Sequence, residues 1–253
     1  MKKLILFLSV ISFALLVTSC IDEGGNNYTD STYVYIDMSD NGVMYGKTIS
    51  PYTNMRFITN PNMTAMIPGE IKVMYYSWDE EYGTTALSIS GETVQADNVR
   101  LAGESFELKI EPLIMDIEAP EVEEPKKFLE IAAPLYADNK EFMNDNWIVQ
   151  YAYEAGKDQI ANVEFYKREG ETIVGNNIII AVDVHLTLTG PSEGTALEPK
   201  ASAIALNMSQ LRAEYEGSGD SSTKNLKVEF YYYLKGLDGK QKSQQTYSLT
   251  IAG

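Results

Sequence analysis

The sequence predicts an all-β protein with a small N-terminal barrel or sheet and a C-terminal β-sandwich. Short segments in which apolar and polar residues alternate follow one another along the chain, separated by clusters of Gly, Pro and Asn. This period of two is typical of strands that bury one face. Helical periodicity is confined to a short segment after residue 206. With one Cys and one His in 253 residues, neither an internal disulfide nor a Cys/His zinc site can form.

Residues 1–19 have the pattern of a secretory signal. Lys2 and Lys3 precede an apolar run at 4–17, which is too short to cross a hydrocarbon core of about 30 Å as a helix. The run ends in Leu-Val-Thr-Ser-Cys at 16–20, which resembles the bacterial lipobox. The resemblance implies that the signal is removed and that Cys20 receives a diacylglycerol on sulfur and an acyl chain, such as palmitate, on its new amino group. Lipid would then anchor the mature chain to a membrane.

Residues 20–30 are predicted to be a flexible tether behind this lipid, because the segment is polar and contains two glycines. Asp22 and Glu23 resemble the export signal of surface lipoproteins in Bacteroidota. The resemblance implies an outer-membrane location facing the cell surface, with the periplasmic leaflet as the alternative. The triplet Asp-Ser-Thr at 30–32 resembles an O-glycosylation sequon of the same phylum, which makes Ser31 a candidate modification site in the tether.

Residues 31–115 are predicted to form the N-terminal β-domain. We expect its strands near residues 33–36, 71–78, 84–89 and 106–110. Pro61 and Pro68 interrupt the pattern, since proline has no backbone N–H for a ladder. Residues 116–127, DIEAPEVEEPKK, combine five acidic residues with two prolines and have little apolar surface to bury. We therefore expect an acidic linker between the domains at 116–127.

Residues 128–253 are predicted to form an immunoglobulin-like β-sandwich, because many short strands follow at regular spacing. We expect these strands near residues 147–153, 163–166, 178–188, 201–206, 226–234 and 247–251. A helix of one or two turns is expected at 207–215, with an Asn or Ser cap and Gly217 at its end. Within 178–188 the even-numbered apolar residues share one face. Asp183, His185 and Thr187 then lie on the other, polar face, where we expect His185 to be exposed to solvent.

The organisation of the chain resembles a known family. The lipobox, the acidic leader, a Tyr-rich first domain with Trp-Asp-Glu-Glu-Tyr-Gly-Thr at 78–84, and a second domain with Trp-Ile-Val-Gln-Tyr at 147–151 are similar to the NigD-like lipoproteins of Bacteroidota. The resemblance implies an N-terminal OB-type barrel followed by a C-terminal β-sandwich. It carries no catalytic residue over to this chain, because most members have no assigned biochemical role.

The charge excludes several classes of partner. The net charge is −16, and removal of Lys2 and Lys3 with the signal makes it about −18. Nucleic acids and anionic lipid surfaces require clustered Lys and Arg, which this chain lacks. We therefore expect no nucleic-acid partner and attachment to the membrane through the lipid on Cys20.

No catalytic residue, metal site or cofactor site is predicted. His185 and Asp183 lie two apart on one strand face, where both would merely face solvent. The acidic residues 79–81, and the set at 138, 141 and 145, have carboxylates that calcium favours but lack the order of a preformed calcium loop. The glycines at 42 and 46 are one residue too close for a phosphate loop.

The tyrosines are better candidates for a binding function than for catalysis. The chain has 17 Tyr against 8 Phe and 2 Trp, so most of its aromatic residues are tyrosines. Tyr231, Tyr232 and Tyr233 place rings on both faces of one strand, so at least one ring must lie at a surface or an interface. These three residues are the candidate binding surface. We expect a non-enzymatic, lipid-anchored protein of the cell envelope that binds another envelope protein or a surface polymer. The alternative is a surface carbohydrate-binding lipoprotein that uses exposed Tyr or Trp. A glycoside hydrolase with two carboxylates is the third hypothesis.

Overall fold

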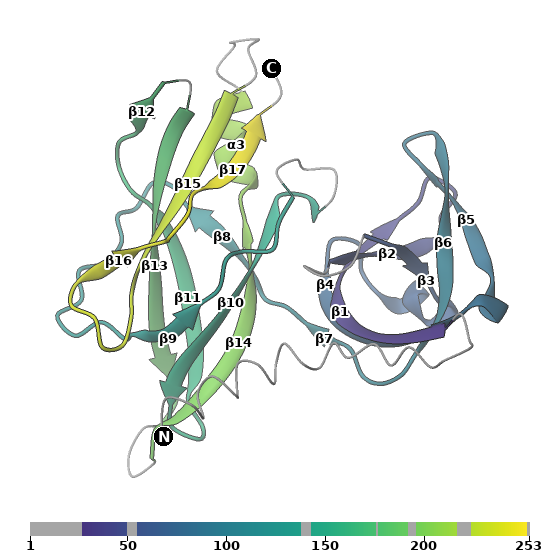
Figure 1. Ribbon diagram of the computed structural model, residues 1–253, viewed down its shortest axis with the longest axis horizontal. Helices are drawn as coiled ribbons and strands as arrows, with labels where there is room; N and C mark the ends of the chain where they lie inside the picture. Colours follow the sequence, from purple (N-terminus) through teal and green to yellow (C-terminus); the bar gives the residue numbers. More distant parts are fainter. Residues whose placement is uncertain are drawn as a thin grey trace. The chain divides into compact units, whose positions relative to one another are not determined.

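The computed structural model describes residues 27–49, 55–137, 143–175, 177–191, 196–216 and 224–251. Within them the chain is almost entirely β-structure with one α-helix, which confirms the all-β prediction. It divides into two compact units, residues 1–108 and 109–253, that are described separately below (Figure 1). No helix in the described part is long and apolar enough to span a membrane.

The first unit is a closed barrel. Its strands are β1 (Asn27–Met38), β2 (Met44–Ile49), β3 (Phe57–Thr59), β4 (Ile71–Asp79), β5 (Thr84–Ile89), β6 (Glu92–Leu101) and β7 (Phe106–Glu107). The ladder runs from β1 through β2, β3 and β6 to β4, and β4 pairs with β1 again, so the ring has no open edge. The β3–β6 pair is parallel and the other pairs of the ring are antiparallel. This closed five-strand ring agrees with the barrel that the sequence predicts.

Alternation along the strands fills the barrel interior. Val34, Ile36 and Tyr76 are completely buried in one cluster with Ile58, and the 3-10 helix η2 (Pro61–Ala65) contributes Met63 to it. Gly46 lies where β2 passes closest to these side chains: a Cβ there would lie 2.3 Å from Cγ1 of Val34. Only a glycine fits this position without moving the core.

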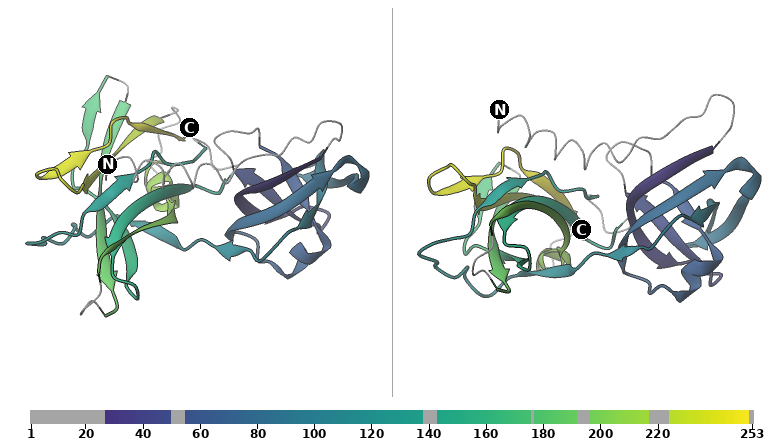
Figure 2. Two further views of the ribbon diagram at one scale, coloured as in Figure 1. Left: turned by 60° about the horizontal axis from the view of Figure 1, so that its bottom comes forward. Right: turned by 90° about the horizontal axis from the view of Figure 1, so that it is seen from below.

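The second unit is one strongly curled sheet. Its strands are β8 (Ile110–Ile114), β9 (Phe128–Ile131), β10 (Asn146–Ala155), β11 (Ile160–Lys167), β12 (Thr172–Val174), β13 (Asn177–Thr189), β14 (Glu198–Asn207), β15 (Lys224–Tyr233), β16 (Lys240–Lys242) and β17 (Tyr247–Ile251). The order is β16-β15-β13-β11-β8-β14-β10-β9, and an isolated bridge from Phe128 to Leu234 links β9 back to the end of β15. Figure 2 shows the curl that makes this closure possible.

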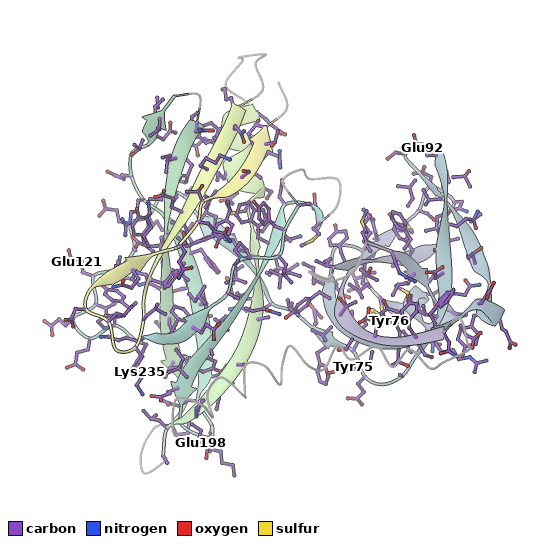
Figure 3. All side chains as sticks on the ribbon, viewed as in Figure 1. Tyr75, Tyr76, Glu92, Glu121, Glu198 and Lys235 are labelled. Atoms are coloured by element: carbon purple, nitrogen blue, oxygen red, sulfur yellow. The ribbon has the colours of Figure 1, made fainter. Side chains whose placement is uncertain are left out.

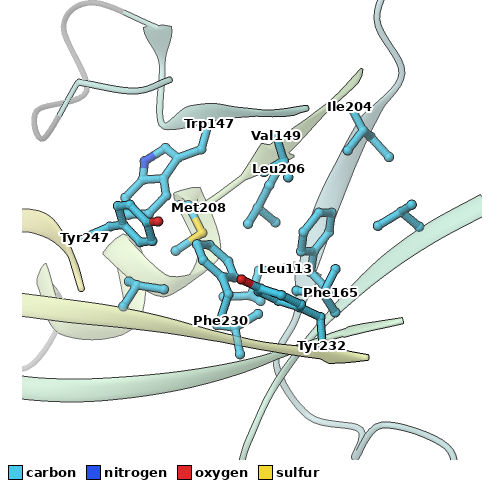
Figure 4. Packing of buried hydrophobic residues seen from close by; sticks show 14 of the residues in the cluster. Leu113, Trp147, Val149, Phe165, Ile204, Leu206, Met208, Phe230, Tyr232 and Tyr247 are labelled. Carbon is cyan, nitrogen blue, oxygen red and sulfur yellow. The ribbon is translucent and has the colours of Figure 1, made fainter. Parts of the chain in front are cut away.

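Three pairings in this unit are parallel: β8 with β11, β8 with β14, and β13 with β15. An immunoglobulin sandwich consists of antiparallel sheets. The three parallel pairings are therefore a feature that the predicted immunoglobulin-like topology does not contain. The inner faces enclose a continuous aromatic core around Trp147, Phe230 and Tyr247 (Figure 4). The predicted helix is present as α3 (Ser209–Glu216), and it buries Leu211 in this core.

The boundary between the units differs from the expected acidic linker at 116–127. The amide of Leu108 donates to the carbonyl of Ile71 in the barrel, whereas the carbonyl of Lys109 accepts from Ala205 in the second unit. The expected strand at 106–110 is therefore two strands, β7 and β8, that belong to different sheets. The acidic segment follows β8 and connects it to β9 inside the second unit. The amino-acid composition predicted the wrong boundary because the junction between residues 108 and 109 contains no polar, glycine-rich stretch.

Residues 27–30, the last four of the expected tether at 20–30, lie in a strand. β1 begins at Asn27 and pairs with β4 from its first residue, because Asn27 lies opposite Asp79. Ser31 therefore lies in the middle of a strand, opposite Tyr75, rather than in the tether. Cys20 and the signal lie outside the described residues.

Candidate functional site

The second unit has a polar layer on the outer face of its sheet, opposite the core. Strand alternation directs these side chains outward, and the register aligns them in rows across β11, β13, β15 and β16. We call this layer the outer patch, and its residues are Glu164, Tyr166, Arg168, Asp183, His185, Glu229, Tyr231, Tyr233, Lys240 and Lys242. Its central row runs from Tyr166 through Asp183 and Tyr231 to Lys242.

Asp183 is the centre of the outer patch. Nε and Nη2 of Arg168 donate to its two carboxylate oxygens at 2.9 and 2.8 Å, and Nζ of Lys240 donates to Oδ1 at 2.8 Å. The carboxylate is nearly buried, with 8% of its side chain exposed. Burial alone would raise the pKa of Asp183, but these hydrogen bonds outweigh it and hold the pKa below its usual value. Two cations on one carboxylate leave this part of the patch with a positive charge.

The tyrosines of the patch support these cations. The guanidinium of Arg168 lies 3.8 Å from the ring centre of Tyr231, and Nζ of Lys240 lies 5.8 Å from that of Tyr233. The three consecutive tyrosines alternate as predicted: Tyr232 is buried in the core cluster, whereas Tyr231 and Tyr233 are half-buried on the outer face. Stacking and bidentate pairing together restrict Arg168 to one orientation.

His185 is buried, so the prediction that it faces solvent is wrong. It lies on the predicted face, but only 9% of the residue is exposed and its ring packs edge-on against Tyr166 at 5.5 Å. Long side chains on neighbouring strands form a second layer over this face, which alternation alone does not reveal. Nε2 of His185 is buried and has no hydrogen-bond partner in the described part of the chain.

Burial lowers the pKa of His185, and the charge of Lys240 lowers it further, while Asp183 and Glu164 oppose the shift. The unfolded chain therefore takes up this proton first as the pH falls below about 6.5. We expect the free energy of unfolding to fall between pH 7.5 and 5.5, with a slope of at most about 1.4 kcal/mol per pH unit for one proton. Urea unfolding across this range should show a smaller pH dependence for His185→Gln than for the wild type. Equal dependence in both proteins would contradict a depressed pKa.

The other candidates from the sequence have structural roles. Asp145 is buried and pairs with Arg212 of α3 at 2.7 Å. Its two proposed companions, Asp138 and Glu141, lie outside the described residues. Asp79 caps the 3-10 helix η3 (Glu80–Tyr82) by accepting from the amide of Glu81 at 2.9 Å. Among the described residues no group of His, Cys, Asp and Glu has an arrangement that could hold a metal ion.

One small cavity lies among the described residues in the interior of the second unit. A cavity of about 20 Å³ lies between β9 and the facing sheet, lined by Pro134, Phe165 and Tyr232 among others. That volume holds about one water molecule, whereas a small-molecule site needs roughly 300 Å³ or more. This cavity is not a substrate pocket, and the polar chemistry of the unit lies on its surface.

On the barrel, side chains of the β5–β6 hairpin cover the outer face of β2. OB-type barrels commonly bind their ligands on the face formed by strands 2 and 3. Here Tyr45 on that face is 1% exposed and packs with Leu87 and Ala96 of the β5–β6 hairpin. Nζ of Lys47 and the hydroxyl of Tyr45 both donate to Asp37, at 3.0 and 3.1 Å. The hairpin thus fills the position that a ligand takes in other OB-type barrels.

The sequence indicated only part of the outer patch. The sequence offered Tyr231, Tyr232 and Tyr233 together as a candidate surface, without deciding which rings are exposed, and Arg168, Lys240 and Lys242 carried no signal of their own. Arg168 is 15 residues from Asp183 in the chain and Lys240 is 57 residues from it. Only the register of β11, β13, β15 and β16 brings these charges together.

Comparisons with known proteins support the fold. No family model matches the chain, and no curated protein matches it. An uncharacterized protein from Parabacteroides merdae is 12% identical, with 88% of this chain and 98% of that chain covered at a TM-score of 0.51. A Bacteroides fragilis protein named as a candidate lipoprotein is 11% identical, with 87% and 97% covered at 0.51. A NigD-like immunity protein from Bacteroides caccae is 9% identical, with 87% and 95% covered at a TM-score of 0.47. At these identities, the first two show the fold alone: it occurs in other proteins.

Proposed function

We propose that this chain is a non-enzymatic, lipid-anchored protein of the cell envelope that binds another protein through the outer patch. The observation that carries the proposal is the arrangement of Arg168, which stacks on Tyr231 and pairs with Asp183 through two hydrogen bonds. Arg and Tyr are enriched among residues that dominate protein interfaces. A side chain that is already held in place loses little entropy on binding.

The same arrangement favours a protein partner over a sugar at this patch. Sugars bind aromatic residues by stacking on an open ring face. Arg168 covers one face of Tyr231, and Lys240 lies over Tyr233. Tyr166 is 8% exposed and contacts His185. A protein can instead use the cations, the hydroxyls and the ring edges together.

The anchor and the family are part of the proposal. Cys20 follows a lipobox-like sequence and is the attachment point that we infer. The acidic residues behind it support export to the outer membrane, facing the cell surface. With the predicted signal and the observed barrel followed by a second β-unit, they support assignment to the NigD-like lipoproteins of Bacteroidota. Glycosylation of Ser31 remains a separate proposal, now for a strand residue.

Carbohydrate binding is the second candidate, and it has its own observation on the barrel. Tyr75 on β4 is 38% exposed and Phe106 on β7 is 60% exposed. Phe106 lies opposite Val73, so the two rings are diagonal neighbours on one outer face. These rings have open faces on which a sugar could stack. Calorimetry with neutral glycans tests this candidate, and absence of heat across a broad panel would count against it.

The main proposal is tested by capture from native outer membranes with the full mature chain as bait. Tyr231→Ala is expected to reduce recovery of the partner about tenfold or more, as truncation of a dominant interface residue does. Tyr82→Ala removes a tyrosine of the barrel that also stacks with an arginine, Arg100. It is the matched control and should leave recovery unchanged. Recovery of the bait alone, or equal recovery with both variants, would contradict binding through the outer patch.

A further inference from the structure

The acidic segment at 116–127 is attached at both sides of the outer patch. It leaves β8 just after Ile114, which is the register partner of Tyr166 on β11. It enters β9 at Phe128, which bridges to Leu234, the residue after Tyr233 on β15. β8 and β15 are three strand spacings apart, about 14 Å, whereas the thirteen residues between the attachments can extend to roughly 40 Å. The segment therefore has ample length to cross the patch between its two ends.

The segment is acidic, whereas the exposed charges of the patch are mainly positive. Arg168, Lys240 and Lys242 have 35%, 27% and 52% of their side chains exposed, although the patch as a whole also contains the carboxylates of Glu164, Asp183 and Glu229. The segment carries five carboxylates, and in the described part of the chain none of them forms an ion pair with the patch. Glu121 and Glu123 are exposed, and Figure 3 draws Glu121 on the same side of the unit as β16. Lys127 already reaches this region, because its Nζ donates to the carbonyl of Leu237 between β15 and β16.

The cations of the patch use only some of their N–H groups in hydrogen bonds to Asp183 and Glu229. Arg168 uses Nε and Nη2 toward Asp183, out of five N–H groups. Lys240 gives one hydrogen bond to Asp183 and Lys242 gives one to Glu229, out of three each. The carboxylates of Asp183 and Glu229 are nearly buried beneath these cations, with 8% and 9% of the side chain exposed. The surface thus offers N–H donors, and its complement is a chain of carboxylates.

We infer that the outer patch binds extended acidic peptide, and that the chain's own segment at 116–124 is its first such ligand. The segment acts as a strap that closes over Arg168, Lys240 and Lys242 and competes with an acidic segment of the partner. The inference rests on the proposed binding role of the patch. It adds the chemistry of the partner and a closed state of the free protein in which the strap covers the patch.

The pKa of His185 measures whether the strap is closed. His185 is the single histidine of the chain, and it lies in the patch beside Lys240. Its NMR titration is compared in the wild type, in Glu121→Gln/Glu123→Gln, and in Asp158→Asn/Glu198→Gln. The control variant removes two exposed charges from the same unit, and Figure 3 shows Glu198 far from Glu121. At low salt we expect the strap variant alone to lower the pKa of His185, because docked carboxylates stabilise the protonated ring. At about 0.5 M salt the three proteins should converge.

Proteolysis provides the second readout. Cleavage after glutamate within 116–124 should be about threefold slower in low salt than in high salt for the intact mature chain, because a closed strap is protected. A free peptide of residues 114–128 corrects for the salt dependence of the protease. Equal His185 titration in all three proteins, together with salt-independent cleavage, would overturn the inference. Failure to capture a partner would instead contradict the proposed function, since strap closure is measured without one.

Discussion

Replacing Asp145 by Asn is expected to lower the free energy of unfolding of the second unit by about 3–5 kcal/mol. Asp145 and Arg212 have only 4% and 5% of their side chains exposed. Nε of Arg212 donates to both carboxylate oxygens at 2.8 and 2.7 Å, and Nη1 donates to the carbonyl of Thr250 at 2.6 Å. The arginine therefore ties α3 to the start of β10 and to β17. Without the carboxylate, the buried guanidinium loses a charged partner that is itself buried.

The choice of asparagine isolates the charge. Asp145 has a φ of 62°, in the left-handed region, which asparagine tolerates and most other side chains do not. Adding Arg212→Met should recover part of the lost stability, because no buried charge then remains. Lys235→Ala, which breaks an exposed pair with Glu154, is the control and should cost at most about 1 kcal/mol. Chemical denaturation followed by the fluorescence of Trp147 measures all three. A loss below about 1 kcal/mol for Asp145→Asn would contradict this account.

Replacing Cys20 by Ala is expected to move the protein from the membrane fraction to the soluble fraction. Each buried methylene of an acyl chain contributes about 0.8 kcal/mol, so two or three chains hold a protein at a membrane almost irreversibly. The net charge of −16 gives no electrostatic attraction to anionic lipid in their place. Fractionation and immunoblotting measure the distribution. Ser19→Ala keeps a small residue before the cysteine and should leave the protein in the membrane.

Protease treatment of the same cells measures the orientation of the anchored protein. If the wild type faces outward, protease added to intact cells should degrade it. Survival in intact cells with digestion after lysis would place it on the periplasmic side. Retention of Cys20→Ala in the membrane fraction would contradict lipid anchoring at this residue.

Much of the fold was predictable because its signals are local. The period of two, the Gly and Pro punctuation and the helix cap near residue 207 act between residues close in sequence. They placed β5 and β17 with the observed bounds and located α3 within two residues. The same reasoning failed at the junction of β7 and β8, because one continuous extended segment serves two sheets there. Pairing partners decide that division, and they are distant in the chain.

The candidate site shows the same limit at the level of single residues. Alternation placed His185 and Asp183 on the polar face of their strand, and it placed the tyrosines at 231–233 on both faces of theirs without deciding which face is outer. It did not show that Arg168 and Lys240 lie over Asp183, or that His185 is consequently buried. Burial of a polar residue depends on which long side chains the neighbouring strands bring above it.

The sequence by itself determined the predicted lipid attachment at Cys20, the all-β class and the exclusion of zinc and disulfide chemistry. Each of these depends on composition or on a short contiguous pattern. The tertiary structure alone decided that Asp145 and Arg212 form a buried pair and that an acidic segment is attached at both sides of a patch whose exposed charges are mainly positive. These features depend on strand register, in which residues that are tens of positions apart become neighbours about 5 Å from one another.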